Sequence, residues 1–420
     1  MSSAPSVLPE LHVQKFGGSS LATAERIRAA AARVADSAAG GRPVIVVVSA
    51  MGDTTDELIA LAYKVSPRPN ERELDLLLST GETVSATLLA MALHDLHQPA
   101  VSLTAAQAGI RSTSVFTKAR ITDIHPERIF AELRRGKVVI VTGFQGVTEE
   151  QDVVTLGRGG SDTTAVALAC ALGAERCDIL TDVEGIYTAD PRVVPNARKV
   201  HEIGYEEMLE LAQLGARVMH PRAVELAELY AMPILVSSSF STASGTLIHR
   251  LPNGDAPMPM EIRKNVRGIA HDTDVARITL MRVPDRPGIA AAIFQPLADA
   301  NISVDTIAQS SGADGTTDLS FTVSGSSLLS ALEITRQTAP GIEADTVDAA
   351  DDLAKVSIVG TGMQSAPGYA ARMFSALASA SINISIISTS DIKITCVVPR
   401  DRAEDAVRVL HSAFELDRED

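Results

Sequence analysis

A glycine-rich segment with charged neighbours is the strongest sign of chemistry in this sequence. Residues 153–169 read VVTLGRGGSDTTAVALA, in which a β-branched run meets a cluster of three glycines and then an apolar, helix-like stretch. Glycines let backbone N–H groups turn toward an anion, and the start of a helix adds unpaired N–H donors. Arg158 can hold a carboxylate or phosphate, whereas Asp162 places a carboxylate in the same loop. This mixture favours phosphoryl transfer, although an ordinary strand–turn–helix connection explains the segment equally well when it is taken alone.

A second glycine turn lies near the N-terminus, in KFGGSS (15–20). A predicted strand ends at Phe16, two glycines turn the chain, and a serine can cap the next helix. Lys15 supplies a mobile positive charge suited to neutralising a phosphoryl group in transfer. The spacing differs from G-x-x-x-x-G-K-[ST], so the turn is not a P-loop. A surface lysine before a capped helix is the alternative, and the second glycine loop at 157–160 weakens it.

Four more polar segments each have a functional and a structural interpretation. SAMGDTT (49–55) offers hydroxyl groups to a polar pocket or caps to a helix. TGE (80–82) precedes a predicted helix, where Glu82 either complements the helix N-terminus or binds a substrate ammonium group. TDVEGIYTADPR (181–192) offers Tyr187 to a base and Arg192 to phosphates, or forms a proline-braced surface loop. In GARVMHP (215–221), Arg217 could contact phosphate, and His220 is expected to be structural.

The elements that must position these residues alternate between strands and helices. Strands are predicted at 13–16, 44–49, 138–144, 178–183 and 233–239, and helices at 22–38, 53–65, 72–95, 126–135, 162–173 and 205–214. Such alternation predicts a parallel sheet covered on both faces, with ligands bound at the carboxyl ends of its strands. The glycine-containing segments fall at those ends.

The C-terminal part contains an internal repeat behind a Pro- and Gly-rich linker that begins LPNGDAPMP (251–259). DRPGIAAAIFQPLADANISVDTI (285–307) aligns with SAPGYAARMFSALASASINISII (365–387). Each copy has a strand pattern before it (276–283 and 354–361), a second at its end (302–307 and 382–387) and a third after it (317–323 and 392–398). Helices are predicted at 325–337 and 402–413. The order β-α-β-β-α, twice, is typical of ferredoxin-like modules, which either bind a small ligand or are simply structural or dimerising.

Composition limits the class of protein. The 420 residues exceed one typical domain, and a net charge of −15 argues against a nucleic-acid surface. The three cysteines (170, 177 and 396) form neither a disulfide framework nor a zinc spacing, which favours reduced thiols in the cytoplasm. The N-terminal residues lack a signal-peptide pattern, and no stretch reaches the length of a membrane span.

Taken in order, KFGGSS, SAMGDTTD, TGE, GRGGSDTTA, TDVEGIYTADPR and GARVMHP resemble the aspartate kinases of the amino-acid kinase family, and the repeat resembles their paired ACT regulatory domains. The resemblance implies a three-layer α/β sandwich with a mainly parallel sheet, followed by two ferredoxin-like α+β domains. It places the kinase domain at 11–250, a linker at 251–265, and ACT domains at 266–345 and 346–420.

The same resemblance implies ATP-dependent phosphorylation of the L-aspartate side chain, the entry step to lysine, threonine and methionine. The catalytic residues would be Lys15, which stabilises the phosphoryl group in transfer, and Asp162, which organises that lysine. Arg158 would hold an aspartate carboxylate and Glu82 its ammonium group. The remaining aspartate-site residues would be Ser49, Thr55, Gly159, Gly160 and Ser161. The ATP-site residues would be Lys15, Phe16, Gly17, Gly18, Thr181, Asp182, Tyr187, Thr188, Ala189, Asp190, Pro191, Arg192 and Arg217.

Two features of the site that the resemblance implies concern charge. Arg217 stands where the family often has lysine, an exchange that is not neutral at a tight site. No dense carboxylate cluster is evident, so Mg²⁺ is expected to arrive on ATP rather than in a protein site.

The repeats would sense lysine, threonine or both. The effector-site residues implied are Asp285, Pro287, Gly288, Ser303, Val304, Asp305 and Gln309 in the first copy and Tyr369, Ala370, Asn383, Ile384, Ser390 and Asp391 in the second. The protein would be cytoplasmic and a homo-oligomer, or an α2β2 assembly if Met258 or Met260 starts a separate regulatory subunit; two ordinary linker methionines are the favoured alternative. The competing functions are a related kinase acting on glutamate, N-acetylglutamate or a nucleotide, and an amino-acid sensor without catalysis.

Overall fold

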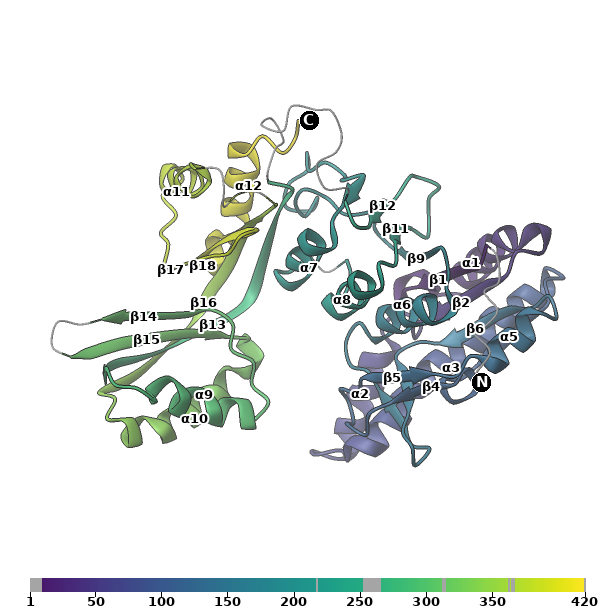
Figure 1. The fold of residues 1–420 in the computed structure, drawn as a ribbon, viewed down its shortest axis with the longest axis horizontal. Coiled ribbons are helices and arrows are strands. Elements are labelled where there is room, and N and C mark those ends of the chain that lie inside the picture. The colour runs from purple at the N-terminus through teal and green to yellow at the C-terminus, as the bar shows by residue number, and fades with distance from the viewer. Residues whose placement is uncertain are drawn as a thin grey trace. The chain divides into compact units, whose positions relative to one another are not determined.

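The computed structural model describes residues 10–216, 218–251, 266–311, 315–361, 363 and 367–418 (Figure 1). The chain divides into two compact units. The first comprises Met1–Ile186, Lys199–Gln213 and Arg217–Met258, and the second comprises Tyr187–Arg198, Leu214–Ala216 and Pro259–Asp420. The linker methionines 258 and 260, and Arg217, lie outside the described residues.

The first unit is built on an eight-stranded sheet in the order β10-β12-β11-β9-β1-β2-β6-β3. All neighbouring strands are parallel except β11 and β12. The strands are β1 (His12–Phe16), β2 (Val44–Val48), β3 (Ala100–Leu103), β6 (Val138–Thr142), β9 (Arg176–Thr181), β10 (Glu202–Ile203), β11 (Ile234–Ser238) and β12 (Thr246–Ile248).

Helices cover both faces of this sheet. The helices are α1 (Ala24–Ser37), α2 (Thr54–Val65), α3 (Glu71–Asp95), α4 (Ala105–Ala108), α5 (Glu127–Leu133), α6 (Gly160–Leu172), α7 (Tyr205–Gln213) and α8 (Pro221–Tyr230). On β2, Val44, Val46 and Val48 share a buried cluster with α1 and α3. Ile45 and Val47 are equally buried and, because side chains alternate along a strand, face the opposite layer, where α6 packs. The prediction of a three-layer α/β fold is therefore confirmed.

A smaller sheet of four strands was not predicted. Its order is β5-β4-β7-β8, with β4 (Ile110–Ser112), β5 (Ile121–Ile124), β7 (Gln145–Val147) and β8 (Val153–Thr155). These strands are three or four residues long, too short for an alternating pattern to stand out. β8 nevertheless matters to function, because it leads directly into the glycine-rich loop.

The second unit contains one six-stranded antiparallel sheet, in the order β14-β15-β13-β16-β18-β17. Its strands are β13 (Gly268–Pro284), β14 (Ile307–Ser311), β15 (Thr316–Val323), β16 (Thr346–Val359), β17 (Ile386–Thr389) and β18 (Lys393–Pro399). Its helices are α9 (Ile289–Asp299), α10 (Leu328–Thr338), α11 (Tyr369–Ser379) and α12 (Ala403–Ala413).

The two long strands, β13 and β16, each serve both repeats. Residues 276–284 of β13 pair with β15 of the first repeat, whereas residues 268–272 pair with residues 355–359 of β16, which belong to the second. Ile278 accordingly lies in the core of the first repeat and Ile269 in that of the second. The domain boundary at 345/346 stays a prediction, because the sheet is continuous across it.

The second strand of each repeat begins later than its β-branched sequence predicts. Residues 302–306 and 382–385 have no strand structure, and β14 and β17 start at Ile307 and Ile386. The reason is that the paired strands, β15 and β18, offer hydrogen-bond partners only to the last part of each predicted strand. Hydrogen bonding to β15 begins only at Asp305, whose N–H donates to the carbonyl oxygen of Thr322 at 3.0 Å, and the corresponding bond in the second repeat begins at Ser385.

Helix α3 is long and apolar enough to cross a membrane by length and composition, although no stretch of that kind was predicted from the sequence. Half of its most apolar 18-residue stretch is buried inside the protein, and Ala86, Leu89 and Leu93 pack in the core beneath the sheet. The apolar residues of α3 are thus explained by a core helix.

Candidate active site

The first part of the site is formed where parallel strands β1, β2 and β9 end side by side. The backbone N–H of Gly17 donates to the carbonyl oxygen of Leu180 at 3.1 Å, and that of Ser49 donates to the carbonyl oxygen of Phe16 at 3.1 Å. A Cβ on Gly18 would lie 2.8 Å from the carbonyl oxygen of Ala50, closer than side chains tolerate. Glycine is therefore required for the β1 turn to approach the loop that follows β2.

Lys15 and Asp162 form a buried ion pair at the centre of these loops. The Lys15 Nζ lies 2.6 Å from the Asp162 Oδ1, and the two side chains are only 11% and 10% exposed. Asp162 stands in the first turn of α6, where a carboxylate is also stabilised by the positive end of the helix dipole. The structure thus brings together the two residues predicted to be catalytic, from sequence positions far apart.

The glycine-rich loop wraps around the start of α6. Gly157 and Gly159 have φ angles of 77° and 68°, values that favour glycine. A Cβ on Gly159 would lie 2.2 Å from the His220 ring. His220 also caps α8, accepting a hydrogen bond at its Nδ1 from the Arg222 N–H at 3.3 Å. The structural role expected for His220 is what the structure shows, and its ring forms one wall against the loop.

The other predicted residues of this loop differ in exposure. Arg158 is exposed, so its guanidinium is accessible to a ligand. Ser161 is 7% exposed and packs against Gly143, where a Cβ would lie 2.7 Å from its Oγ. Gly160 opens α6 and leaves no room for a Cβ beside Leu156.

Glu82 lies inside the helix predicted at 72–95, and not at a helix N-terminus as the interpretation of TGE had it. It lies in the middle of α3, which begins at Glu71, because apolar and small residues on both sides of TGE continue one helix. Its side chain is 2% exposed, and its Oε1 accepts a hydrogen bond from the Ala50 N–H at 3.1 Å. Burial raises the pKa of Glu82 to about 7, which the hydrogen bond from Ala50 only partly offsets.

The second oxygen of Glu82, Oε2, is buried and has no hydrogen-bond partner among the described residues. A buried carboxylate oxygen without a donor fits a cationic ligand group, because an unpaired polar atom in the interior costs free energy. Ser49 is adjacent to Ala50 and half-buried, and Thr55 lies half-buried in the first turn of α2.

The edge of the site at β9 is completed by a residue that the sequence reasoning missed. Ser239, just after β11, donates from its Oγ to the carbonyl oxygen of Thr181 at 3.0 Å, and its Oγ lies 2.7 Å from that of Ser20. Thr181 in turn donates from Oγ1 to Asp182 Oδ1 at 3.2 Å. The serines that end the strand PILVSSS were the available signal.

Asp75 is a second residue that was missed. It is fully buried in α3 and accepts hydrogen bonds from the N–H groups of Thr117 and Thr155, at 2.8 and 2.9 Å, and from the Thr155 hydroxyl at 2.7 Å. Burial raises the pKa of Asp75 despite these bonds. Because Thr155 ends β8, Asp75 fixes the strand that carries the glycine-rich loop; nothing in its sequence neighbourhood indicates this role.

The segment Tyr187–Arg198, whose first six residues were predicted to bind ATP, belongs to the second unit. Thr188 is buried, with its Oγ1 2.9 Å from the Nε2 of His411 on α12. Ala189 lies in the core of the second repeat. Arg192 forms a local ion pair with Asp190 at 2.7 Å, next to the exposed Pro191, and its side chain is 84% exposed. These six residues belong to the second unit and Lys15 to the first.

The effector-site residues of the first repeat are partly brought together. Asp285, Pro287, Gly288 and Gln309 line a cavity of 310 Å³ at the start of α9. Ser303 and Val304 precede β14 and do not line this cavity. Asp305 instead forms an ion pair with Lys355 of β16.

In the second repeat, the predicted residues lie at the start of α11 and around β17, and Asn383 and Ile384 are the counterparts of Ser303 and Val304. Tyr369 and Ala370 open α11 behind Gly368, whose φ is 111°. The Tyr369 ring stacks on that of Phe414 at 6.2 Å between centroids. Asn383 and Ile384 precede β17, and Ser390 and Asp391 lie in the turn before β18.

Comparisons with known proteins agree with this architecture. The model of the amino acid kinase family matches residues 10–238, and models of the ACT domain match residues 277–339 and 356–414. A Pseudomonas aeruginosa protein named aspartokinase is 50% identical over 407 residues, which cover 97% of this chain and 98% of that protein.

Two solved structures are similar over nearly the whole length. E. coli aspartokinase III in complex with aspartate and ADP (R-state) has a TM-score of 0.81 at 28% identity, over 96% of this chain and 99% of that one. The same enzyme in complex with lysine and aspartate (T-state) has a TM-score of 0.73 at 28% identity, over the same shares of the chains.

Proposed function

The chain belongs to the aspartokinases of the amino acid kinase family, and we propose that it transfers the terminal phosphoryl group of ATP to the side-chain carboxylate of L-aspartate, giving 4-phospho-L-aspartate and ADP. The observation that carries this proposal is the buried Lys15–Asp162 ion pair, set between two glycine loops at the carboxyl ends of parallel strands. That edge is where ligands bind in α/β sheets.

The reaction needs charge compensation more than it needs a base. The nucleophile is a carboxylate that is already ionised near neutral pH, so no proton has to be removed. One of its oxygens forms a bond to the γ-phosphorus while the bond to the bridging oxygen breaks, and ADP leaves with the electron pair. Two anions must be held together, and Lys15 supplies a positive charge that Asp162 keeps in place.

Substrate selection is assigned to the groups around Glu82 and Arg158. The buried Glu82 carboxylate, with Oε2 unpaired among the described residues, would receive the α-ammonium group. The exposed Arg158 would hold the α-carboxylate in a two-point contact. Ser49, Thr55 and Ser161 would complete the pocket. This arrangement explains why an acylated amine such as N-acetylglutamate would be rejected, since it has no positive charge for Glu82.

The nucleotide would lie along the ends of β1 and β9, between the Gly17–Gly18 turn and Thr181, with Asp182 beside it. Mg²⁺ would neutralise phosphate charge during transfer. Among residues 10–216 and the other described ranges, no group of three or more His, Cys, Asp or Glu side chains could hold a metal ion. We propose that Mg²⁺ arrives bound to ATP oxygens and water, since the ion keeps much of its hydration and needs few protein ligands.

Regulation is assigned to the second unit. We infer that lysine, threonine or both bind at the starts of α9 and α11, where Gly288 and Gly368 turn the chain into a helix, and that they lower activity by favouring a less active arrangement. The oligomeric state and a second start at Met258 or Met260 remain predictions, as does a cytoplasmic location. An immunoblot of native extract with an antibody to the C-terminus would test the second start: a single full-length band would exclude it.

Turnover of the purified full-length chain tests the main proposal. ADP release should require L-aspartate, and the acyl phosphate should be trapped by hydroxylamine as the hydroxamate. Lys15→Ala should lose at least about 100-fold in kcat, as expected when a group that stabilises transition-state charge is removed. L-Glutamate and N-acetylglutamate should give little product. Hydroxamate formation that is equal with glutamate, or near-normal turnover by folded Lys15→Ala, would refute the assignment.

A further inference from the structure

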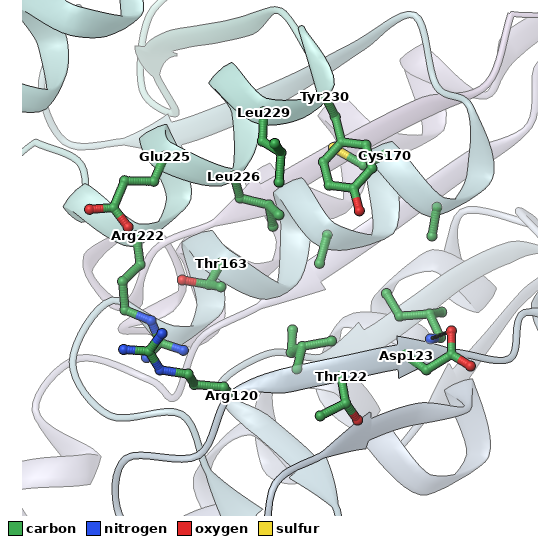
Figure 2. Close-up of a pocket in the computed structure, with 14 residues that line it drawn as sticks. Arg120, Thr122, Asp123, Thr163, Cys170, Arg222, Glu225, Leu226, Leu229 and Tyr230 are labelled. Carbon is green, nitrogen blue, oxygen red and sulfur yellow. Dashed lines mark hydrogen bonds between the residues drawn. The ribbon is translucent and has the colours of Figure 1, made fainter.

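A cavity of 420 Å³ lies beside α6 in the first unit, apart from the residues assigned to aspartate and ATP (Figure 2). Its volume is in the range of small-molecule sites. It has three walls: the face of α6 that includes Cys170, the face of α8 from Arg222 to Tyr230, and the edge strand β5 with Arg120 before it. Of its lining residues, only Thr163 is next to a residue proposed to act in catalysis.

The cavity is lined by residues that share one face of each of the two helices, α6 and α8. Thr163, Ala167, Cys170 and Ala171 recur at intervals of three or four along α6 and form one stripe. The stripe consists of small side chains, which leaves open space against α8. On α8 the facing stripe contains larger groups, including Leu226 and Leu229.

Two arginines stand at one end of the cavity. Figure 2 shows the guanidinium groups of Arg120 and Arg222 beside each other. Burial lowers the pKa of Arg222, and the positive charge of Arg120 lowers it further. Arg222 donates to the carbonyl oxygens of Leu156 and Ala119, at 2.7 and 3.1 Å. Neither arginine has a carboxylate ion-pair partner among the described residues; Glu225 acts on Arg222 only at longer range.

Beside the arginines the cavity has an apolar wall, although Glu225 and Asp123 also line it. Leu229 and Tyr230 stand next to each other at its rim and are 75% and 61% exposed. Leu226 and Ile121 continue the apolar wall inward. Two arginines without a direct ion-pair partner in the described part of the chain at one end, with apolar surface beside them, fit a ligand that has an anionic head and an apolar body.

We propose that this cavity binds a small amphipathic monocarboxylate, with its carboxylate between Arg120 and Arg222 and its apolar part against Leu226 and Leu229. A single negative charge is specified because Glu225 and Asp123 also line the cavity and would repel a second one. The site is independent of the aspartate and ATP assignments, so it can be tested without turnover.

The test measures binding of 4-phenylbutyrate, used as the probe, to the full-length chain by isothermal titration calorimetry. Binding should be saturable, and it should weaken about tenfold or more in Arg120→Gln and in Leu229→Asp. Both substitutions change exposed side chains, so folding should be retained. Arg28→Gln, at a surface arginine on α1 that is 70% exposed, is the matched control and should bind like the parent. Neutral 4-phenylbutan-1-ol should bind at least about tenfold more weakly than the acid.

Cys170 provides a local readout. It lines the cavity, whereas Cys177 and Cys396 are fully buried. Burial raises the pKa of the Cys170 thiol to about 11, so little of it is thiolate and its alkylation is slow enough to be followed in time. Alkylation of Cys170 by excess maleimide, followed by mass spectrometry, should be slowed by 4-phenylbutyrate in the parent and not in Arg120→Gln. Absence of saturable binding up to about 10 mM, equal binding of acid and alcohol, parental affinity in both variants, or alkylation of Cys170 unaffected by the probe would each overturn the proposal.

Discussion

Replacing Glu82 with glutamine should stabilise the protein at alkaline pH while it weakens aspartate binding. A rise in the pKa of Glu82 from 4.5 to about 7 corresponds to roughly 3 kcal/mol of free energy against the ionised form, at about 1.4 kcal/mol per pH unit. The side chain is 2% exposed, so solvent screening does not reduce this figure. Glutamine places two amide N–H donors where Oε2 has no described partner, one more unpaired donor than the protonated carboxyl has, and this costs about 1 kcal/mol. The net gain at pH 8 is thus about 2 kcal/mol.

The sign of the pH dependence follows from which state holds the proton. Below pH 4.5 Glu82 is neutral both folded and unfolded, and no penalty exists. Between pH 4.5 and about 7 the unfolded chain ionises first, so the free energy of unfolding of the parent falls as pH rises. Glu82→Gln lacks this loss, and its advantage over the parent should therefore grow from pH 5 to pH 8.

Thermal unfolding of parent and variant, measured across that pH range without ligands, gives the assay. At about 2–4 °C per kcal/mol for a unit of this size, the variant should melt several degrees higher at pH 8 and close to the parent at pH 5. Its KM for aspartate should rise at least about tenfold with ATP binding unchanged. A difference in Tm that is constant with pH, or an unchanged KM, would refute the reasoning about Glu82.

Three further outcomes are expected. Gly159→Ala should abolish turnover and lower Tm, because its φ of 68° and the His220 ring at 2.2 Å both exclude a Cβ; a kinetic assay beside circular dichroism checks it, and normal activity would contradict the loop geometry. Asp75→Ala should lower the free energy of unfolding by about 2–4 kcal/mol, since three donors lose their acceptor, and urea denaturation measures it, with Asp95→Ala at an exposed position of the same helix as the control. Burial lowers the pKa of His411, so the second unit should lose stability as pH falls below the usual histidine value; this loss should be absent in His411→Leu, and hydrogen exchange on α12 would reveal either result.

The sequence predicted the long elements and the chemistry at their ends, for physical reasons that are specific. β2 is a run of five buried β-branched or aliphatic residues, and α1 has a 3.6-residue apolar period, so both patterns are unambiguous. Lys15 and Asp162 were found because glycine turns mark them. The small sheet was missed because strands of three or four residues carry no clear period. The helix at 72–95 was predicted, but Glu82 was also assigned to a helix N-terminus because Gly81 resembled a helix boundary, whereas that glycine is needed for close packing on Ala50.

Contacts between segments that are distant in the sequence could not be predicted from it. Residues 187–198 are the example that matters most for regulation. The motif TADPR is polar enough to be a nucleotide loop, but its fold is decided by Ala189, Val193 and Val194, which are buried in the core of the second repeat. The chain returns to the first unit at Lys199, immediately after this segment. Residues 187–198 closely follow β9, which ends at Thr181, and they pack as part of the second unit. We expect them to move with that unit. We therefore expect that an effector which moves the second unit would act on the chain a few residues from the proposed ATP-binding edge.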